Sequence, residues 1–405
     1  MTRLVCAAVC FLVMVATAWG ADGITRSTIT VGSVLALKGQ AQGLGLLMKL
    51  GMEAAFRDDK VQGRAIVLNA ANDYYEPDQA VIETKRLLEE GIFVMIGNVG
   101  TPTAAVTLPI LKENKIPAVG FFTGAGILRP GAGGPIVNYR ASYVEETLAV
   151  ITEALNAGIR IDEVCAFVQN DPFGMAGLAG VKAAFESRRG NADSIRIIDT
   201  LLKMPGDNPN RNYLGPVGVY TRNDIEARPG YYSLKAWEKS SGTPCRLVVT
   251  VGAYAPIAEF VRLSRKSGEK WVISAVSFTG ADSLLDYLKQ YRTMDRIVMT
   301  QVVPLLDSTR PIVVEAKQRL GYGFSFGSLE GYVVGKMFLH ILRDIKGDIS
   351  RESFLKQVAV SKFDLGGIAI DFTKGNQGSS LVVTSYPTES GYREVSPALW
   401  RQMAR

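Results

Sequence analysis

The sequence predicts an α/β protein in which two doubly wound parallel-sheet lobes enclose a central cleft. Short apolar runs typical of buried strands alternate with helical patterns, and this rhythm occurs once before about residue 144 and again after it. The chain has 405 residues, of which 47% are hydrophobic and 21% charged. This length allows two or three domains, and the composition is that of ordinary globular proteins.

The first half is expected to form βαβ units. Its helix at 76–91 has the clearest ends, because Pro77 lies at its start, acidic residues fill its first turn and Gly91 closes it. Ligands bind beyond the carboxyl ends of parallel strands, so the loops after these strands should share one edge. The strands are expected at 27–37, 64–73, 92–99 and 116–125, the other helices at 44–59 and 101–115, and the loops begin at Gly39, Asp73, Gly97 and Thr123.

The second half repeats the alternation from Glu145 onward. The segment 203–218 is rich in Pro, Gly and Asn and is expected to be an excursion loop whose role the sequence does not reveal. Two similar sheets with facing strand-end loops form a cleft, and a hinge between such lobes closes on a ligand. Helices are expected at 145–158, 177–190, 233–240 and 257–268, and strands at 163–171, 194–202, 245–254 and 271–278.

The first twenty residues differ from the rest of the chain. Arg3 is followed by an apolar run to about Ala18, and Ala18 and Gly20 supply small residues at the positions before a cleavage point. This pattern predicts a secretory signal peptide over 1–20, cleaved before Ala21. An uncleaved membrane anchor is the alternative, but the run is short for a membrane span. No later segment has about twenty uninterrupted apolar residues, so we expect a soluble, exported mature chain.

The net charge of +6 is dispersed along the sequence. The densest basic stretch, 262–270, suits a solvated helix end, and no basic face with interleaved aromatic residues indicates nucleic-acid binding. Cys165 and Cys245 remain after cleavage. They would be free to pair in an oxidising compartment, but two separate buried thiols are equally compatible with the sequence, since spacing alone does not determine geometry.

Common catalytic and metal-binding patterns are missing from the sequence. The one histidine, His340, lies within a helical pattern, where a structural role is expected. Neither a Gly-x-Ser-x-Gly elbow nor a His-x-x-x-His or Cys-x-x-Cys pair is present. We therefore expect no catalytic residues, no metal and no cofactor. An exported hydrolase, the competing class, would depend on His340.

The stretch "VMIGNVGTPTAA" (94–105) is a strand, a tight turn and a helix start, which is an arrangement that binds anions. A phosphate-binding Walker loop would require a lysine after its second glycine, whereas Thr101 and Pro102 follow Gly100 here. The expected anion is therefore a small carboxylate, held by hydroxyl groups and backbone N–H groups.

An ordered series of segments resembles the extracytoplasmic solute-binding proteins of ABC importers, of the leucine/isoleucine/valine-binding type. The series begins with "YEPDQAVIETKRLLEEGIFVMIGNVGTPTAAVTLPILKENKIPAVGFFTGA" and continues with "DPFGMAGLAGVKAAF", "VGAYAPIAEFVRLSRKSG", "MTQVVP" and "SLEGYVVGKMFLHIL". The likeness covers essentially 29–392. It implies two lobes joined by three hinge crossovers, with lobe 1 formed by 24–144 and 303–372 and lobe 2 by 145–302 and 373–405.

The resemblance also implies ligand-binding residues. The ligand carboxylate of the family is held by a hydroxyl loop and the next strand-end loop, and aromatic residues of the second lobe cover the ligand. Thr101 would also suit a helix N-cap, and the aromatic residues would also suit a core. The matching positions are Gly100, Thr101, Thr123 and Gly124 for the carboxylate, and Phe173 and Tyr254 for the cover.

Two positions depart from the family pattern. Ser277 stands where relatives that bind α-amino acids carry an acid for the ammonium group, and Leu44 replaces an early aromatic residue. Glu145 or Glu146 at the lobe crossover, or Asp171, would be substitutes for the missing acid, and we include Glu145 and Ser277 among the site residues. A solvated or helix-capping acid is the alternative for each.

These features together predict a periplasmic binding protein without enzymatic activity. It would capture a small polar solute, an amino acid or related carboxylate, and deliver it to an ABC permease in the inner membrane. A sensor subunit that docks on a membrane receptor or kinase is the alternative. The ligand, the oligomeric state and the pairing of the cysteines are left open.

Overall fold

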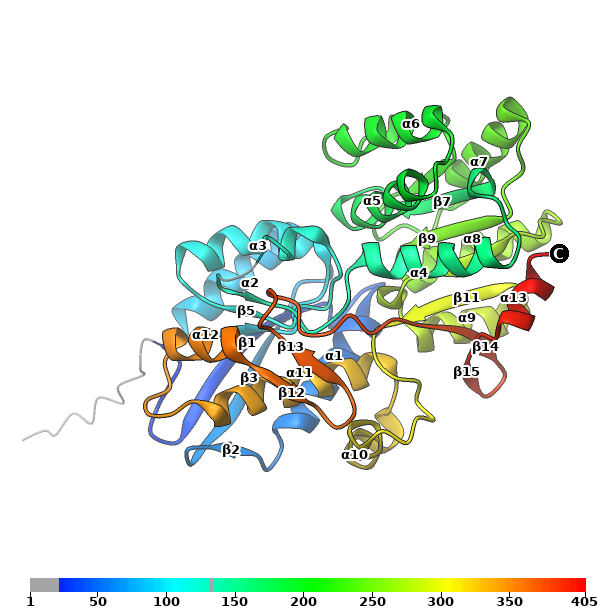
Figure 1. Ribbon diagram of the computed structural model, residues 1–405. Helices are drawn as coiled ribbons and strands as arrows, with labels where there is room; N and C mark the ends of the chain where they lie inside the picture. The colour runs from blue at the N-terminus through cyan, green and yellow to red at the C-terminus, as the bar shows by residue number, and fades with distance from the viewer. Residues whose placement is uncertain (1–21, 132–133) are drawn as a thin grey trace, which may run out of the picture.

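The computed structural model describes residues 22–131 and 134–405, and it contains two large sheets and one small one (Figure 1). The predicted signal peptide at 1–20 lies outside the described residues. The first large sheet has the strand order β2-β3-β1-β4-β5-β6, in which all neighbours are parallel except the β2–β3 pair. Its strands are β1 (Thr28–Leu35), β2 (Lys60–Val61), β3 (Arg64–Asn72), β4 (Met95–Ile96), β5 (Ala118–Val119) and β6 (Ile136–Val137).

The second large sheet has the order β15-β14-β11-β10-β9-β7-β8. Its strands from β7 to β11 are parallel, and the two late strands β14 and β15 add an antiparallel edge. The predicted α/β fold with two parallel-sheet lobes is confirmed. The strands are β7 (Val164–Gln169), β8 (Val217–Tyr220), β9 (Leu247–Val251), β10 (Val272–Ala275), β11 (Ile297–Gln301), β14 (Val383–Thr388) and β15 (Gly391–Glu394).

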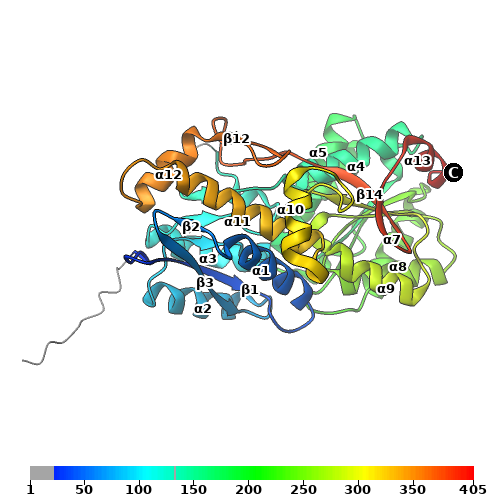
Figure 2. The same cartoon turned by 90° about the horizontal axis from the view of Figure 1, so that it is seen from below.

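Helices cover both lobes. Those of lobe 1 are α1 (Gln42–Phe56), α2 (Pro77–Glu89), α3 (Thr101–Glu113), α10 (Pro311–Leu320), α11 (Phe326–Asp344) and α12 (Arg351–Val360). Those of lobe 2 are α4 (Tyr143–Asn156), α5 (Pro172–Ser187), α6 (Ala192–Lys203), α7 (Arg228–Ser241), α8 (Tyr254–Lys266), α9 (Ala281–Tyr291) and α13 (Pro397–Met403). In lobe 1, α1 lies against α11 (Figure 2).

Glycine makes the close approach of α1 and α11 possible. A Cβ atom at Gly51 would lie 2.1 Å from the backbone oxygen of Ser328, and one at Gly331 would lie 2.3 Å from that of Met48. Real Cβ atoms do not come this close to backbone, so a larger residue at either position would push the helices apart. This packing places α11, which carries part of the site, next to the start of α1.

The chain passes between the lobes three times, at 138–142, 302–310 and 372–382. Hydrogen bonds tie these crossovers together. Asn138 N donates to Asn376 O at 2.8 Å, Ser379 N donates to Tyr139 O at 2.9 Å, and the Tyr139 hydroxyl donates to Val302 O at 2.9 Å. The small hairpin of β12 (Lys362–Asp364) and β13 (Ala369–Asp371) precedes the third crossover. The three segments therefore form one connected hinge.

The strand expected at 194–202 is wrong, because this segment belongs to helix α6. Ile195, Ile198 and Leu202 recur at helical spacing, and the Asn191 side chain caps the helix by accepting hydrogen bonds from the N–H groups of Asp193 and Ser194. The strand of this region is β8, which begins at Val217, within the segment expected to be an excursion loop. β8 pairs in parallel with β7 at the sheet edge.

The rest of the expected excursion loop is organised by Arg211. The guanidinium group of this residue is buried and donates to Leu201 O at 3.1 Å, to Gly206 O at 2.6 Å and to Asn170 Oδ1 at 2.7 Å, and it also contacts Met204 O. A cation at the end of a helix satisfies its last carbonyl groups and suits its dipole. The loop is therefore an ordered continuation of α6.

Cys165 and Cys245 form a disulfide, with their Cα atoms 5.7 Å apart. The bond connects the start of strand β7 to the segment before β9, its neighbour in the sheet. In the part of the chain that the structure describes, we find no helix that combines the length and the apolar character needed to cross a membrane.

Candidate functional site

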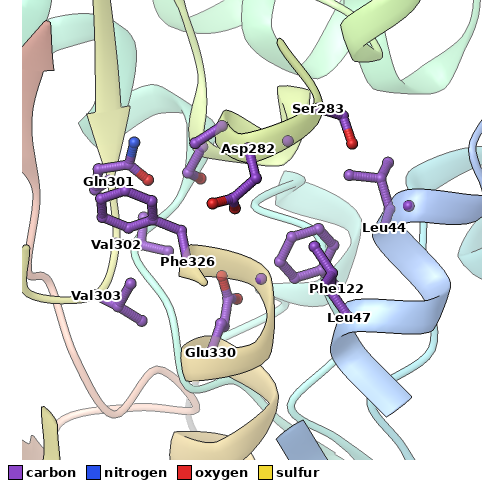
Figure 3. A pocket seen from close by; sticks show the side chains of 15 residues that line it. Leu44, Leu47, Phe122, Asp282, Ser283, Gln301, Val302, Val303, Phe326 and Glu330 are labelled. Atoms are coloured by element: carbon purple, nitrogen blue, oxygen red, sulfur yellow. The ribbon is translucent and has the colours of Figure 1, made fainter. Parts of the chain in front are cut away.

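The carboxyl-end loops of both sheets meet between the lobes, and the cleft that they form is almost filled. A cavity of about 10 Å³ lies between α1 and α11 of lobe 1 and the start of α9 and the end of β11 of lobe 2 (Figure 3). This volume is that of about one water molecule. The structure therefore shows the two lobes in a closed arrangement.

The hydroxyl residues predicted for carboxylate binding lie together on lobe 1. The hydroxyl oxygens of Thr101 and Thr123 are 2.7 Å apart, and both residues are buried. Gly100 has a positive φ of 106°, and a Cβ atom there would lie 2.3 Å from the ring of Tyr75, so the loop requires glycine. Gly124 O accepts a hydrogen bond from Tyr143 N at 2.9 Å. Two separate strand-end loops thus build one hydroxyl pair.

Thr101 is the first residue of helix α3, and Gly100 occupies the N-cap position without a side-chain hydrogen bond. The N-capping role that the sequence also allowed for Thr101 is therefore not the one that the structure shows. The N–H groups of the first turn of α3 lie beside the Thr101–Thr123 pair, and a helix N-terminus favours negative charge.

Tyr143 is a site residue that the sequence reasoning missed. It is fully buried at the start of α4, and its hydroxyl group has no hydrogen-bond partner among the residues that the structure describes. Burial raises the pKa of Tyr143 to about 12, so this hydroxyl is a donor at neutral pH. An aromatic residue at a helix start is typical of core packing, so the sequence held no distinctive signal for this role.

Aromatic rings from both lobes occupy the middle of the cleft. The ring of Phe278, from lobe 2, lies 4.6 Å from Phe173 between centroids, 5.3 Å from Phe122 and 6.1 Å from Tyr75. Phe173, predicted as a covering aromatic residue, also lies 5.1 Å from the ring of Tyr143. Phe278 thus connects the two lobes by apolar contacts. These rings occupy the place where aromatic residues were expected to cover a solute.

Tyr254, the second predicted covering residue, spans the cleft at another point. Its hydroxyl oxygen accepts a hydrogen bond from Gly43 N, at the start of α1, at 3.4 Å. The residue is buried, and its ring stacks near that of Tyr287 at 6.1 Å. Tyr254 therefore contacts lobe 1 directly in the closed arrangement.

Ser277 takes part in a buried ionic network centred on Glu146. The backbone N–H of Ser277 donates to one carboxylate oxygen of Glu146 at 2.7 Å, and its hydroxyl group donates to the other at 3.0 Å. Thr300 adds a third donor at 2.5 Å, and Arg140 forms an ion pair with Glu146 at 3.0 Å. The carboxylate absent at position 277 is thus replaced by one that reaches this point from α4.

Glu145, which we had included among the site residues, lies apart from this network. Its carboxylate accepts hydrogen bonds from the N–H and hydroxyl groups of Ser142 at 2.7 Å, and Ser142 in return caps helix α4. Gln377, in the third crossover, donates to the same carboxylate at 2.9 Å. Glu145 is therefore part of the hinge, and the acid of this pair that the structure brings to Ser277 is Glu146.

Arg140 also contacts a second buried acid. Its Nη1 atom lies 3.4 Å from Oε1 of Glu330, a residue of α11 that lines the cavity. Burial lowers the pKa of Arg140, but the carboxylates of Glu330 and Glu146 raise it by more. The net shift of the pKa is upward, so the guanidinium stays charged. Burial raises the pKa of Glu330 to about 7 against the opposing effect of Arg140, and burial raises that of Asp282, also in the cavity wall, to about 6.

Polar residues join the lobes on the opposite rim of the cleft. Arg222 of lobe 2 forms an ion pair with Glu76 of lobe 1 at 2.7 Å, and Gln169 donates to the Tyr75 hydroxyl at 3.3 Å. Asp171, one of the alternatives for the missing acid, caps helix α5 by accepting from Phe173 N at 2.9 Å. Its carboxylate is therefore engaged within lobe 2.

His340, the residue on which an exported hydrolase would depend, lies outside the cleft. His340, on α11, stacks on the ring of Phe363 at 3.9 Å and is 3.7 Å from Asp344. Within 22–131 and 134–405, no group of three or more His, Cys, Asp or Glu side chains is arranged to hold a metal ion. What the cleft offers is a set of hydroxyl donors, buried charges and aromatic rings, which suits solute binding.

Comparisons with known proteins agree with this geometry. A family model described as periplasmic binding protein matches residues 28–197. A solved structure described as a possible leucine/isoleucine/valine-binding protein from Rhodopirellula baltica SH 1 is 31% identical, covers 94% of this chain and 99% of its own, and has a TM-score of 0.80. This chain belongs to the periplasmic binding proteins of the leucine/isoleucine/valine-binding type.

Two other relatives of this periplasmic binding protein are more distant. A substrate-binding periplasmic protein from Ralstonia solanacearum shares the fold with a TM-score of 0.73 at 20% identity, over 91% of this chain and all of that one. The curated Leu/Ile/Val-binding protein homolog 3 of Brucella melitensis is 29% identical over 116 residues, which is 28% of this chain. The match spans 29% of the length of that curated relative. The family resemblance stated from the sequence is thereby confirmed.

Proposed function

We propose that this periplasmic binding protein is the exported receptor of an ABC importer. It captures a small amino-acid-like carboxylate by closure of its two lobes and presents the closed form to a permease in the inner membrane. The observation that carries this proposal is the group of buried hydroxyls between the lobes, Thr101 and Thr123 of lobe 1 with Tyr143 of lobe 2, beside the aromatic ring of Phe173. The predicted signal peptide and the names of the relatives support export and the solute class.

The hydroxyl group is suited to a carboxylate. Thr101 and Thr123 bond to each other in the closed arrangement, and Tyr143 has no partner in the described part of the chain. A carboxylate oxygen entering here would accept hydrogen bonds from these donors, with the positive end of the α3 dipole beside it. Gly100 and Gly124 pack closely against Tyr75 and Tyr143, since a Cβ atom at these positions would lie 2.3 Å and 2.7 Å from them, so both loops require a residue without a side chain.

Solute binding requires the lobes to separate, because the closed cleft has no room for a solute. Phe278 would move away from Phe122 as lobe 2 rotates about the crossovers, and the ligand would take up the space between them. The binding free energy would come from a few convergent hydrogen bonds and from aromatic surface removed from water. No bond of the solute is made or broken, and we propose no catalytic role for any residue.

Ligand-dependent thermal stabilisation tests the proposal. The mature protein is screened by differential scanning fluorimetry against the standard amino acids and small mono- and dicarboxylates. Because a ligand that binds only the native state raises its stability, at 100 times Kd by about 2.7 kcal/mol, at least one compound should raise the Tm by several degrees. A complete screen without any shift would contradict the proposal.

Two shape-preserving variants locate the carboxylate site. Thr101→Val and Tyr143→Phe each remove one hydroxyl, and each should weaken binding of the ligand found in the screen by roughly 10-fold to 100-fold, since hydrogen bonds to a charged group contribute about 1.5–3 kcal/mol. Thr107→Val is the matched control, because Thr107 lies on the same helix but bonds to Thr103 O, 2.9 Å away, inside α3. Equal affinities for all three variants would place the site elsewhere.

A further inference from the structure

The cavity in the cleft has more buried negative than positive charge. Its wall includes Glu330 from lobe 1 and Asp282 from lobe 2, and Figure 3 shows these two carboxylates entering the same space from opposite sides. Arg140, the buried cation beside the cavity, already forms its closer ion pair with Glu146, at 3.0 Å against 3.4 Å for Glu330. One guanidinium thus faces two buried carboxylates, and a third acid lies across the cavity.

Glu330 is the acid with the least compensation. It is 3% exposed, and within the described ranges its Oε1 atom has no hydrogen-bond partner and is in contact with one cation, Arg140, at 3.4 Å. An ionised carboxylate in such surroundings is costly unless it is paired and hydrogen-bonded. Burial raises the pKa of Glu330 to about 7 although Arg140 opposes the shift, which agrees with an acid that Arg140 compensates only in part.

The size of the cavity limits what the partner can be. About 10 Å³ holds a group the size of one water molecule. A primary ammonium group has this size and presents three N–H donors, whereas a guanidinium or a trimethylammonium group is larger. Leu44, Phe122 and Phe326 line the cavity and keep bulk water away, so a charge pair formed there would be weakly screened.

We propose that this cavity binds a primary ammonium group of the transported solute, with Glu330 as its principal acceptor and Asp282 as the second carboxylate. The proposal deepens the proposed function and rests on it, because it states which second group the carboxylate-bearing solute carries. It assigns the ammonium to acids of α11 and α9, not to position 277. Glu146 is excluded as the acceptor, since Ser277, Thr300 and Arg140 already occupy its oxygens.

Isothermal titration calorimetry on matched solutes tests the proposal. Alanine, leucine, phenylalanine and glutamate are each compared with the deaminated acid (propanoate, 4-methylpentanoate, 3-phenylpropanoate and glutarate) and with the N,N,N-trimethyl derivative. For every set in which the amino acid binds the wild-type protein, the deaminated and trimethylated forms should bind at least about 30-fold more weakly, because a buried charged group would be left unpaired.

The variant Glu330→Gln separates a binding role from a structural one. It should weaken binding of the amino acid by roughly 10-fold to 100-fold and leave the affinity for the deaminated acid unchanged or higher. Asp282→Asn should have a smaller effect of the same kind. Asp286→Asn, an exposed position one turn further along α9, is the matched control and should behave as wild type.

Three outcomes would overturn the inference. Deaminated acids that bind the wild-type protein as tightly as amino acids would remove the ammonium site but leave the proposed function standing. A Glu330→Gln variant that loses affinity equally for both members of a pair would show a structural role for Glu330. If no compound of these sets or of the fluorimetry screen binds, the proposed function fails and the inference fails with it. Melting curves of each variant establish that it is folded.

Discussion

The carboxyl group of Asp73 lies buried at the carboxyl end of β3, where it shapes the turn that carries Tyr75 into the cleft. Its Oδ1 atom accepts a hydrogen bond from Tyr75 N at 2.8 Å, while Oδ2 has no partner among the described residues. Burial raises the pKa of Asp73 from 3.8 to about 7, and the nearby carboxylates of Glu76 and Glu83 add to this effect. This residue is thus protonated more readily in the folded than in the unfolded protein.

The consequence is a pH dependence of stability with a defined sign. Because the pKa of Asp73 in the folded state is above its unfolded value, the folded state binds the proton more tightly, and this residue favours folding increasingly as the pH falls from about 8 towards 4. Asp73→Asn keeps the acceptor for Tyr75 N and removes the charge. The variant should melt a few degrees above wild type at pH 8 and near wild type at pH 4.5.

Thermal unfolding curves from pH 4.5 to 8 check this prediction. Asp348→Asn, at an exposed loop position, is the control and should follow wild type across the range. A constant difference between Asp73→Asn and wild type at every pH would mean that the pKa of Asp73 is not raised in the folded state.

At the scale of elements, the segment after helix α6 shows how one buried cation, Arg211, can order a stretch with little secondary structure. The end of α6 and the turns after it leave several carbonyl groups without helical partners, and Arg211 donates to three of them and to Asn170 Oδ1. Asn170 belongs to the strand-end loop after β7, which precedes the cleft residue Asp171. The segment 203–216 is therefore coupled to the loop that follows β7 in lobe 2.

Arg211→Met should destabilise the protein by about 2–4 kcal/mol, because it leaves several buried acceptors unsatisfied. Hydrogen exchange followed by mass spectrometry should show faster exchange in peptides that cover 192–216. Arg196→Met is the control on the same helix. Its ion pair with Asp193 joins two exposed side chains, 77% and 75% exposed, so its removal should cost less than about 0.5 kcal/mol. Equal effects of the two variants would contradict the assigned role of Arg211.

At the scale of the whole molecule, two kinds of contact hold the lobes closed. The buried contacts are those of Phe278 with Phe122 and of Tyr254 with Gly43. On the rim, Arg222 pairs with Glu76, and Asn223 donates to the same carboxylate at 2.6 Å. Such partly exposed pairs contribute about 0–1 kcal/mol each, which is enough to change an open-to-closed ratio several-fold.

Arg222→Ala should therefore shift the ligand-free protein towards the open form. Small-angle X-ray scattering of the ligand-free protein should give a larger radius of gyration, since a smaller fraction of molecules is closed. Arg228→Ala is the matched control, because Arg228 pairs with Glu226 at 2.5 Å within lobe 2. An unchanged radius of gyration for Arg222→Ala would show that the buried contacts alone determine closure.

Much of the fold could be predicted because its signals are local. Apolar runs and helical spacing depend on neighbouring residues, so the alternation of strands and helices was readable in both lobes. The hydroxyl residues Thr101 and Thr123 were named from the family resemblance, and in the structure each follows a strand at the same sheet edge. The strand expected at 194–202 failed because its apolar residues are dense enough for either element, and the partner strand β8 was hidden in a Pro- and Gly-rich segment.

The choice between Glu145 and Glu146 illustrates what could not be predicted from the sequence. Adjacent residues on a helix point about 100° apart, so one faces the hinge and the other the cleft. The spacing of Ser142 and Glu145 is that of a capping box, and this signal would have assigned Glu145 to the helix end. It would not have shown that Glu146 meets Ser277 and Thr300, which lie more than 130 positions further along the chain.

By itself, the sequence determined the two-lobed α/β fold and the family, because both are written in an ordered series of short-range patterns. Only the tertiary structure decided that Cys165 and Cys245 are joined and that Arg140, Glu146 and Glu330 share one buried cluster. These groups come from distant segments, and their meeting depends on how the sheets and helices pack. The buried charge that indicates an ammonium-bearing solute is therefore a property of the folded molecule.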